Sequence, residues 1–396
     1  MKKWLALAAV VVFCLALVIG VACGDEEEER EGVKEVKLGI GHPTGGIYYH
    51  LAGVLNERGF ELANEHIGEF TVAGETYRWK LIMEDNMYSP AGGVASATKL
   101  IFEDGVSFMF QMGGDASMAA QPYCEESGVI LFAHGTGIEA FGPDKPHTFQ
   151  ASPAYEYLVP QFYKFIHEQY PEVKTQSLVE ETTVPGEVRG ELQKECGEYY
   201  GIDTLEVDYM EYMAGGERMP IAAKHKDIDP DLIVGIIIEE LKLLGWEGIV
   251  AFCTMYDWMV KGADPDVLEG LLVYLPLPFA EGVPEEIAEF RAEYEARHGE
   301  GFEVACTYPI MTLCVLTQAL QKAGTVDDVD SIIEMLETET FDTPWGSVHF
   351  VGEDFCGVNH LIAWPGWISQ FQDGKFRVVQ QFTSDEAEAL ALEVLR

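Results

Sequence analysis

The feature that most constrains the fold of this chain is a regular alternation of short apolar runs with longer amphipathic segments. Strands in such a series are expected to be parallel, because each connection back to the same sheet passes through a helix. The predicted strands are residues 36–40, 79–83, 107–111, 129–132, 147–151, 175–179, 205–209, 232–236 and 249–252. We therefore predict an α/β fold.

The alternation restarts after residue 150 and changes character near the C-terminus. Helices are predicted from Ser89, from Pro284 and over residues 309–323, each marked by a capping residue, a first-turn proline or a terminal glycine. The last predicted elements are two strands joined by Asp373-Gly374, a dipeptide typical of the turn in an antiparallel hairpin. Two α/β sheets in tandem, with a late crossover, predict two Rossmann-like lobes with a cleft between them.

The N-terminal segment is typical of exported proteins. Two lysines precede an uncharged apolar run over residues 4–22, which ends at Cys23 and is followed by the acidic stretch 25–31. An uncleaved membrane anchor is the alternative, because the run nearly reaches the ~20 residues that span a bilayer. Residues 20–23 resemble a bacterial lipobox, although Gly20 stands where that pattern usually has leucine. We predict a signal peptide over residues 1–22 and a lipidated acidic tether over residues 23–33.

The charge of the chain excludes one class of partner. The formal net charge is -42, from 25 Lys+Arg against 67 Asp+Glu. A polyanion repels nucleic acid and anionic lipid. We therefore expect no nucleic-acid partner and membrane contact through the lipid anchor only.

Motifs for cofactors, metals and catalysis are missing or incomplete. The stretch after the first strand reads Gly39-x-Gly41-x-x-Thr44, so it lacks the third glycine of the dinucleotide fingerprint. Residues 225–231 alternate carboxylates but lack the glycine and glutamate of a calcium loop, so they are interpreted as a solvated turn. The cysteines form no zinc-type spacing, and no nucleophile elbow occurs. We expect no cofactor, no metal and no catalysis.

Glycine-rich loops follow three strands of the first lobe. They are residues 42–46, 112–117 and 133–137, and the carboxyl ends of parallel strands meet at the edge where ligands bind. Their backbone N–H groups, with the hydroxyls of Thr44, Ser117 or Thr136, suit a carboxylate. The helix after the first loop is expected to turn Ile47 and Leu55 to the core.

Several longer segments resemble one protein family. The stretches "MEDNMYSPAGGVASATKLI", "ESGVILFAHGT", "PDLIVGI" and "FDTPWGSVHF" are similar to landmarks of the type I periplasmic solute-binding proteins of branched-chain amino acid ABC transporters, the Leu/Ile/Val-binding-protein type. The resemblance extends from about residue 35 to residue 382. It implies two lobes that are joined by a three-stranded hinge and closed by the ligand. On this basis lobe 1 comprises residues 34–150 and 275–352, and lobe 2 comprises residues 151–274 and 353–396.

The resemblance also implies where the ligand is held. Carboxylate contacts fall on residues 113–117 and 135–137, and the contacts of the second lobe fall on residues 183–185 and 254–258. Together with the first loop, the predicted ligand-binding residues are His42, Thr44, Tyr48, Gly113, Gly114, Asp115, Ser117, His134, Gly135, Thr136, Thr183, Tyr256 and Asp257.

The chemistry of the ligand depends on Asp257 and its aromatic neighbours. If Asp257 faces the cleft beside Tyr256 and Trp258, they hold an ammonium group, and the ligand is a branched or aromatic amino acid. If both rings are core and Asp257 caps a turn, an acid or amide without an amine fits as well.

The resemblance implies a non-catalytic function outside the cytoplasm. The expected protein is a periplasmic or cell-surface lipoprotein that delivers a small solute to the permease subunits of an ABC importer. The alternatives are a ligand-binding sensor that docks on a signalling partner, and an enzyme whose catalytic residues converge from distant positions.

Overall fold

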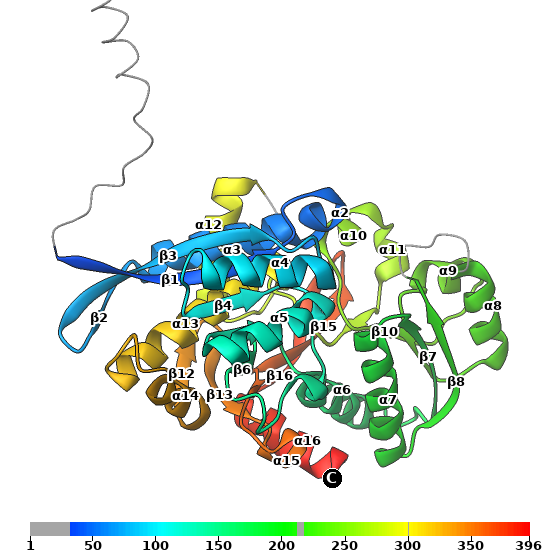
Figure 1. Cartoon of the computed structure of the whole chain (residues 1–396). Helices are drawn as coiled ribbons and strands as arrows, with labels where there is room; N and C mark the ends of the chain where they lie inside the picture. Colours follow the sequence, from blue (N-terminus) through cyan, green and yellow to red (C-terminus); the bar gives the residue numbers. More distant parts are fainter. Residues whose placement is uncertain (1–31, 212–217, 300) are drawn as a thin grey trace, which may run out of the picture.

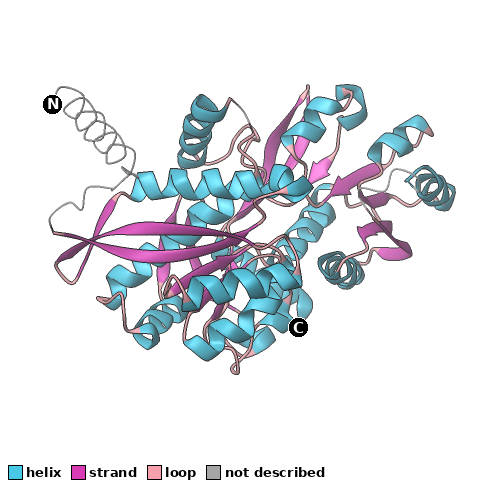
Figure 2. Cartoon of the chain, turned by 45° about the horizontal axis from the view of Figure 1, so that its top comes forward, coloured by secondary structure: helices cyan, strands magenta, loops and turns pink. Residues whose placement is uncertain are grey.

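The computed structural model describes residues 32–211, 218–299 and 301–396, and it contains two lobes built on separate sheets (Figure 1). The predicted signal peptide and Cys23 lie outside the described residues. The alternating series predicted from the sequence is confirmed as an α/β fold with mainly parallel sheets. Strands lie in layers between helices in both lobes (Figure 2).

The sheet of lobe 1 has six strands in the order β2-β3-β1-β4-β5-β6. All neighbours pair in parallel except β2, which forms an antiparallel hairpin with β3. Every residue of β4 and β5 is buried, because helices cover both faces of the sheet. The strands are β1 (Val33–His42), β2 (Glu69–Val72), β3 (Glu75–Asp85), β4 (Phe108–Gln111), β5 (Ile130–Ala133) and β6 (Thr148–Gln150).

The helices of lobe 1 include a long apolar helix of 20 residues, α13. It is long and apolar enough to cross a membrane, but most of it is buried inside this lobe. It packs closely on α3, where a Cβ on Gly59 would lie 2.6 Å from the carbonyl oxygen of Cys306. The helices are α2 (Gly46–Tyr48), α3 (Val54–Ile67), α4 (Pro90–Phe102), α5 (Gly114–Ser127), α12 (Glu285–His298), α13 (Val304–Ala323) and α14 (Val329–Thr338).

The sheet of lobe 2 has seven strands in the order β16-β15-β11-β10-β9-β7-β8. The five strands from β11 to β8 are parallel, and the predicted C-terminal hairpin adds β15 and β16 in antiparallel fashion. The strands are β7 (Thr175–Glu181), β8 (Asp203–Met210), β9 (Leu232–Gly235), β10 (Ile249–Phe252), β11 (Leu272–Val273), β15 (Gly366–Gln372) and β16 (Lys375–Phe382). The helices are α6 (Tyr155–Gln169), α7 (Val184–Tyr199), α8 (Arg218–Ile228), α9 (Ile238–Leu243), α10 (Asp257–Gly262), α11 (Pro265–Leu268) and α16 (Ser384–Leu395).

A small antiparallel sheet lies close to the crossover between the lobes. Its strands β12 (Thr340–Thr343), β13 (Gly346–Val351) and β14 (Leu361–Ala363) are followed directly by β15 of lobe 2, and α15 (Glu353–Cys356) precedes β14. Helix α16 packs on β13 and β14 as well as on α6 and α7, so it spans this region. Its start is fixed by a capping box between Thr383 and Glu386.

Three local predictions are wrong. Ile47 is exposed, because a single π-helical turn at Tyr49–Gly53 separates it from α3 and shifts its helical face. Helix α13 begins at Val304, five residues before Pro309, which lies inside it. The predicted solvated turn over residues 225–231 begins too early, because His225 lies on α8, where its buried ring pairs with Asp208 of β8.

Candidate functional site

The carboxyl ends of the lobe 1 strands are tied together by one buried amide. Asn86, directly after β3, donates from Nδ2 to the carbonyl oxygens of Gly41 and Met112, at 3.2 and 2.7 Å. The next two loops touch at their glycines, since a Cβ on Gly114 would lie 2.3 Å from the carbonyl oxygen of Gly135. The glycine-rich loops therefore form one packed surface, as their positions at one sheet edge predict.

Tyr88 lies on this surface, and the sequence interpretation missed it. It follows Met87 in a tight turn where both residues have positive φ, 47° and 49°, which is costly for side chains of this size. Its ring stacks on that of Tyr48 with centroids 4.5 Å apart. It also covers Gly113, where a Cβ would come within 2.9 Å of the ring. Backbone strain of this kind concentrates at functional sites.

His134 presents a neutral imidazole. Its Nδ1 lies 3.4 Å from the backbone nitrogen of Gly113 and accepts that N–H, so the remaining proton is assigned to Nε2. Burial lowers the pKa of His134 to about 4, which keeps the ring uncharged at neutral pH. The ring contacts Tyr308 of α13 at 4.6 Å between centroids. Nε2–H is thus a fixed hydrogen-bond donor.

On lobe 2, a buried ion pair orients Tyr155 at the start of α6. Arg189 forms two hydrogen bonds to Oε2 of Glu180, at 3.1 and 2.8 Å, and both side chains are buried. Its third contact is a donation from Nη1 to the hydroxyl oxygen of Tyr155, at 3.1 Å. Because this oxygen accepts from Arg189, its own O–H proton is free to donate to another group.

Tyrosines from both lobes gather at the same place. Burial raises the pKa of Tyr308 well above its usual value, and Tyr155, Tyr256, Cys253 and Tyr88 lie near enough to raise it further. Tyr308 belongs to the lobe 1 core, whereas Cys253 belongs to the lobe 2 core. The carboxyl edges of the two sheets therefore meet around a set of phenol rings.

Two buried hydroxyls near these edges are unused. Thr136 follows β5 and Thr254 follows β10, and neither Oγ1 has a hydrogen-bond partner among the residues that the structure describes. Buried polar groups are almost always paired, so an unpaired hydroxyl at the end of a strand indicates a position where water or a ligand binds.

The loop with Tyr256, Asp257 and Trp258 lies at the start of α10. Asp257 pairs with Lys261, Oδ2 to Nζ 2.7 Å, and its backbone N–H donates to Oε1 of Glu303 at 2.7 Å. Trp258 is 52% exposed, so it is not core, and its ring stacks on Tyr256 at 6.3 Å.

Other predicted residues are already engaged within the fold. The hydroxyl of Ser117 donates to the carbonyl oxygen of Gln111 at 2.8 Å, and Thr183 caps α7 by accepting from the backbone of Gly186. His42 is buried and donates from Nδ1 to the carbonyl oxygen of Gly53 at 3.2 Å. The backbone N–H of Gly135 donates to Ser152 at 3.2 Å. These groups hold the loops in place.

The last two predicted residues are exposed. Asp115 lies in the first turn of α5, and the backbone of Thr44 donates to Asp85 at 3.1 Å. In addition to burial, the charge of Asp115 lies near enough to Tyr88 to raise the pKa of that phenol, and the side chain of Thr44 bonds to Asp85.

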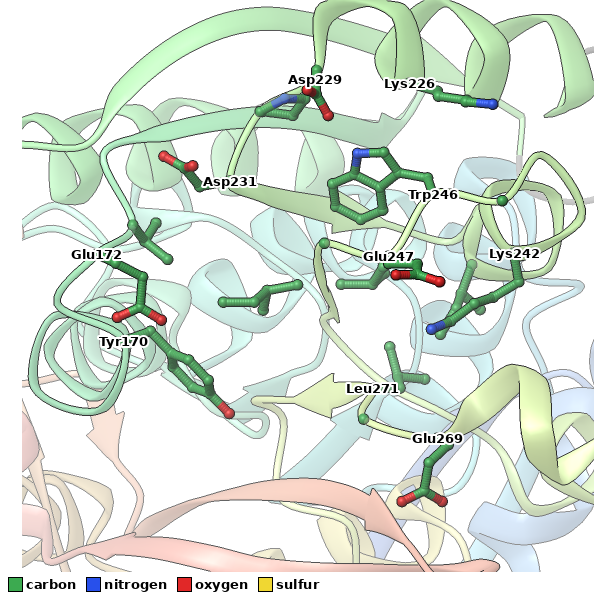
Figure 3. Close-up of a pocket in the computed structure, with 18 of the residues that line it drawn as sticks. Tyr170, Glu172, Lys226, Asp229, Asp231, Lys242, Trp246, Glu247, Glu269 and Leu271 are labelled. Carbon is green, nitrogen blue, oxygen red and sulfur yellow. The ribbon is translucent and has the colours of Figure 1, made fainter.

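A separate hollow of about 950 Å³ lies on lobe 2, close to the amino ends of β7, β9 and β10 (Figure 3). Glu172, Asp229, Glu247 and Glu269 are exposed around it, while Trp246 is buried in its wall. Within the described ranges, no group of three or more His, Cys, Asp or Glu residues could hold a metal ion. Because the hollow lies at the opposite ends of the strands, it is distinct from the tyrosine-lined site.

Comparison with known proteins identifies the fold. No protein-family profile matches the chain, and no curated protein matches it by sequence. Among solved structures it is similar to a solute-binding protein of an ABC transporter from Rhodopseudomonas palustris in complex with 3,4-dihydroxybenzoic acid (TM-score 0.74, 19% identity, 89% of this chain and 98% of that chain covered). It is also similar to an ABC transporter substrate-binding protein from Sphaerobacter thermophilus (TM-score 0.77, 16% identity, 89% of this chain and 98% of that chain covered). A third similar structure is a leucine-binding protein from Thermotoga maritima (TM-score 0.69, 18% identity, 88% of this chain and 99% of that chain covered). The chain therefore has the two-lobe fold of these solute-binding proteins.

Proposed function

We propose that this protein is a non-catalytic, extracytoplasmic receptor that binds a small carboxylic acid between its lobes and delivers it to the permease of an ABC importer. The observation that carries the proposal is the pair of oriented donors, Nε2–H of the neutral His134 and the hydroxyl of Tyr155. The two belong to different lobes, so an anion held by both would draw the lobes together.

An aromatic or otherwise apolar body suits the same place. Tyr88, Tyr256 and Tyr308 present ring surface around the donors, and apolar surface contributes about 25 cal/mol per Å² removed from water. Asp257 is already paired with Lys261, so we do not assign it to an ammonium group. The solved relatives include one with dihydroxybenzoic acid and one named for leucine, which are acids with apolar bodies.

Calorimetry with two kinds of probe, an aromatic acid and an amino acid, tests this proposal. We expect 3,4-dihydroxybenzoate or benzoate to bind the purified protein, and benzamide, which lacks the carboxylate, to bind more weakly by at least tenfold. Leucine is the second probe, and tighter binding of leucine than of benzoate would instead assign Asp257 to its ammonium group. If neither acid binds, and none copurifies with the protein on mass spectrometry, the proposed function is wrong.

We further propose that the mature chain is anchored through a lipid on Cys23 and contacts the membrane in no other way. The apolar run that ends at this cysteine beside an acidic stretch supports the proposal. Mass spectrometry of the native N-terminus tests it: we expect an acylated Cys23, and an intact Met1 without acyl groups would refute it.

The division of the chain between the lobes is also part of the proposal. We propose lobe 1 as residues 34–150 and 275–352 and lobe 2 as residues 151–274 and 353–396. Domain motion measured between ligand-free and ligand-bound crystals would locate the crossings.

A further inference from the structure

Glu303 is a buried carboxyl that its own helix does not use. It precedes α13, is 4% exposed, and makes no side-chain capping bond to that helix within the described chain. A glutamate in this position normally stays in water, because burying its charge is costly. Its burial therefore requires a specific role.

Among the described residues, this carboxyl makes one hydrogen bond, and that bond crosses between the lobes. Oε1 of Glu303 accepts the backbone N–H of Asp257, with 2.7 Å between the oxygen and the nitrogen. Phe302 and Val304 beside Glu303 belong to the lobe 1 core, whereas Met255, two residues before Asp257, belongs to the lobe 2 core. The contact thus fastens the loop of Tyr256 and Trp258 to lobe 1.

The other oxygen of the carboxyl is unsatisfied. Oε2 is buried and has no hydrogen-bond partner in the described residues. Burial, aided by the charge of Asp257, raises the pKa of Glu303 to about 8 against the opposing hydrogen bond from the backbone of Asp257 and the charge of Lys261. Among the described residues, Tyr256 and Cys306 are further titratable groups near it. The carboxyl is therefore protonated at neutral pH in this arrangement.

We propose that Glu303 is a positioning residue that latches the Tyr256–Trp258 loop of lobe 2 onto lobe 1 in its neutral form, and so makes closure on the ligand dependent on pH. The proposal rests on the proposed function for its effect on affinity, but the latch itself exists without ligand. Glu303 acts through the loop that it holds and is not assigned a contact with the ligand.

The direction of the pH effect follows from linkage. If the lobes separate, the carboxyl meets water and its pKa returns toward about 4.3. A group whose pKa is higher in the closed form takes up a proton on closing, so closure is favoured at low pH and weakens as pH rises toward 8. Above about pH 8 the carboxyl is ionised in both forms, so closure no longer depends on pH. Burial lowers the pKa of His134 to about 4, so a return toward its usual pKa of about 6.5 on opening would act in the opposite sense and only below about pH 6.5.

The experiment measures acid binding by calorimetry from pH 6 to pH 9, with 3,4-dihydroxybenzoate as the probe. We expect the wild-type affinity to fall by about 10- to 100-fold over this range, with proton uptake on binding. Glu303→Gln keeps the acceptor and stays neutral, so its affinity should be nearly constant across the range. Glu334→Gln, at an exposed position on α14, is the matched control and should reproduce the wild-type profile.

A measurement without ligand separates this proposal from the proposed function. Amide hydrogen exchange at residues 254–262 should be slow in the wild type and in Glu303→Gln, and at least tenfold faster in Glu303→Ala. Equal exchange in all three proteins would overturn the latch, as would a Glu303→Gln profile that falls with pH like the wild type. If the wild-type protein binds no acid but the exchange differs as expected, the proposed function fails and the latch stands.

Discussion

Replacing Tyr155 with phenylalanine tests the donor pair that supports the proposed function. The hydroxyl of Tyr155 is held by Nη1 of Arg189, and we expect its proton to be donated to the ligand carboxylate. A hydrogen bond to a charged group contributes about 1.5–3 kcal/mol. Tyr155→Phe should therefore raise the Kd for a bound aromatic acid by about 10- to 150-fold.

The fold should survive this change, because Arg189 keeps both hydrogen bonds to Glu180. The loss of one neutral acceptor costs about 1 kcal/mol, which lowers Tm by no more than about 3 °C in a chain of this size. Tyr170→Phe is the matched control, since its hydroxyl accepts from Gln370 beside the distant hollow, and its Kd should match the wild type.

Calorimetry and a thermal scan on the three proteins decide the matter. A Kd for Tyr155→Phe within twofold of the wild type, with Tm nearly unchanged, would refute the role of this hydroxyl. A loss of binding that accompanies unfolding would refute the expectation that the pair of Arg189 and Glu180 keeps the fold intact without this hydroxyl.

Three further predictions concern the loops and the charges that support the site. Gly113→Ala should lower Tm and weaken acid binding, because the residue has a φ of +92° and its new Cβ would lie 2.9 Å from the ring of Tyr88; an unchanged Tm would contradict the packing described. Arg189→Ala should lower the free energy of unfolding by about 3–5 kcal/mol in chemical denaturation, since it leaves the buried charge of Glu180 without its principal partner. A decrease below about 1 kcal/mol would show that the pair is solvated. The free energy of unfolding should fall as pH drops from about 6.5 toward 4, because the folded state lowers the pKa of His134 while the unfolded chain takes up the proton at the usual pKa. His134→Gln should reduce this fall. An identical pH profile in the variant would exclude the buried neutral ring.

The secondary structure was largely predictable because it depends on local patterns. The serine cap of α4, the glycine that ends α13 and the turn between β15 and β16 act within a few residues, and the structure has each of them. The failures are local irregularities, such as the π-helical turn before α3, which no spacing of apolar residues announces.

The candidate site was predictable at the level of loops but not of side chains. The glycine-rich loops meet at one edge, as parallel strands require. However, Ser117 was predicted to face the ligand and is used inside the fold, while Tyr88, Tyr155 and Tyr308 were not singled out. The strained turn at Tyr88 and the proline-flanked start of α6 carry no sequence motif for binding.

The sequence by itself therefore determined the order of elements, the two-lobe fold and the loops that carry the site. Only the tertiary structure decided which groups in those loops remain free to bind, because that depends on partners distant in the chain. His134 is oriented by Gly113 and packed on Tyr308, and Glu303 accepts from Asp257, 46 residues before it. Such contacts set the orientation of a donor, its burial and its pKa, so these properties could not be predicted from the sequence alone.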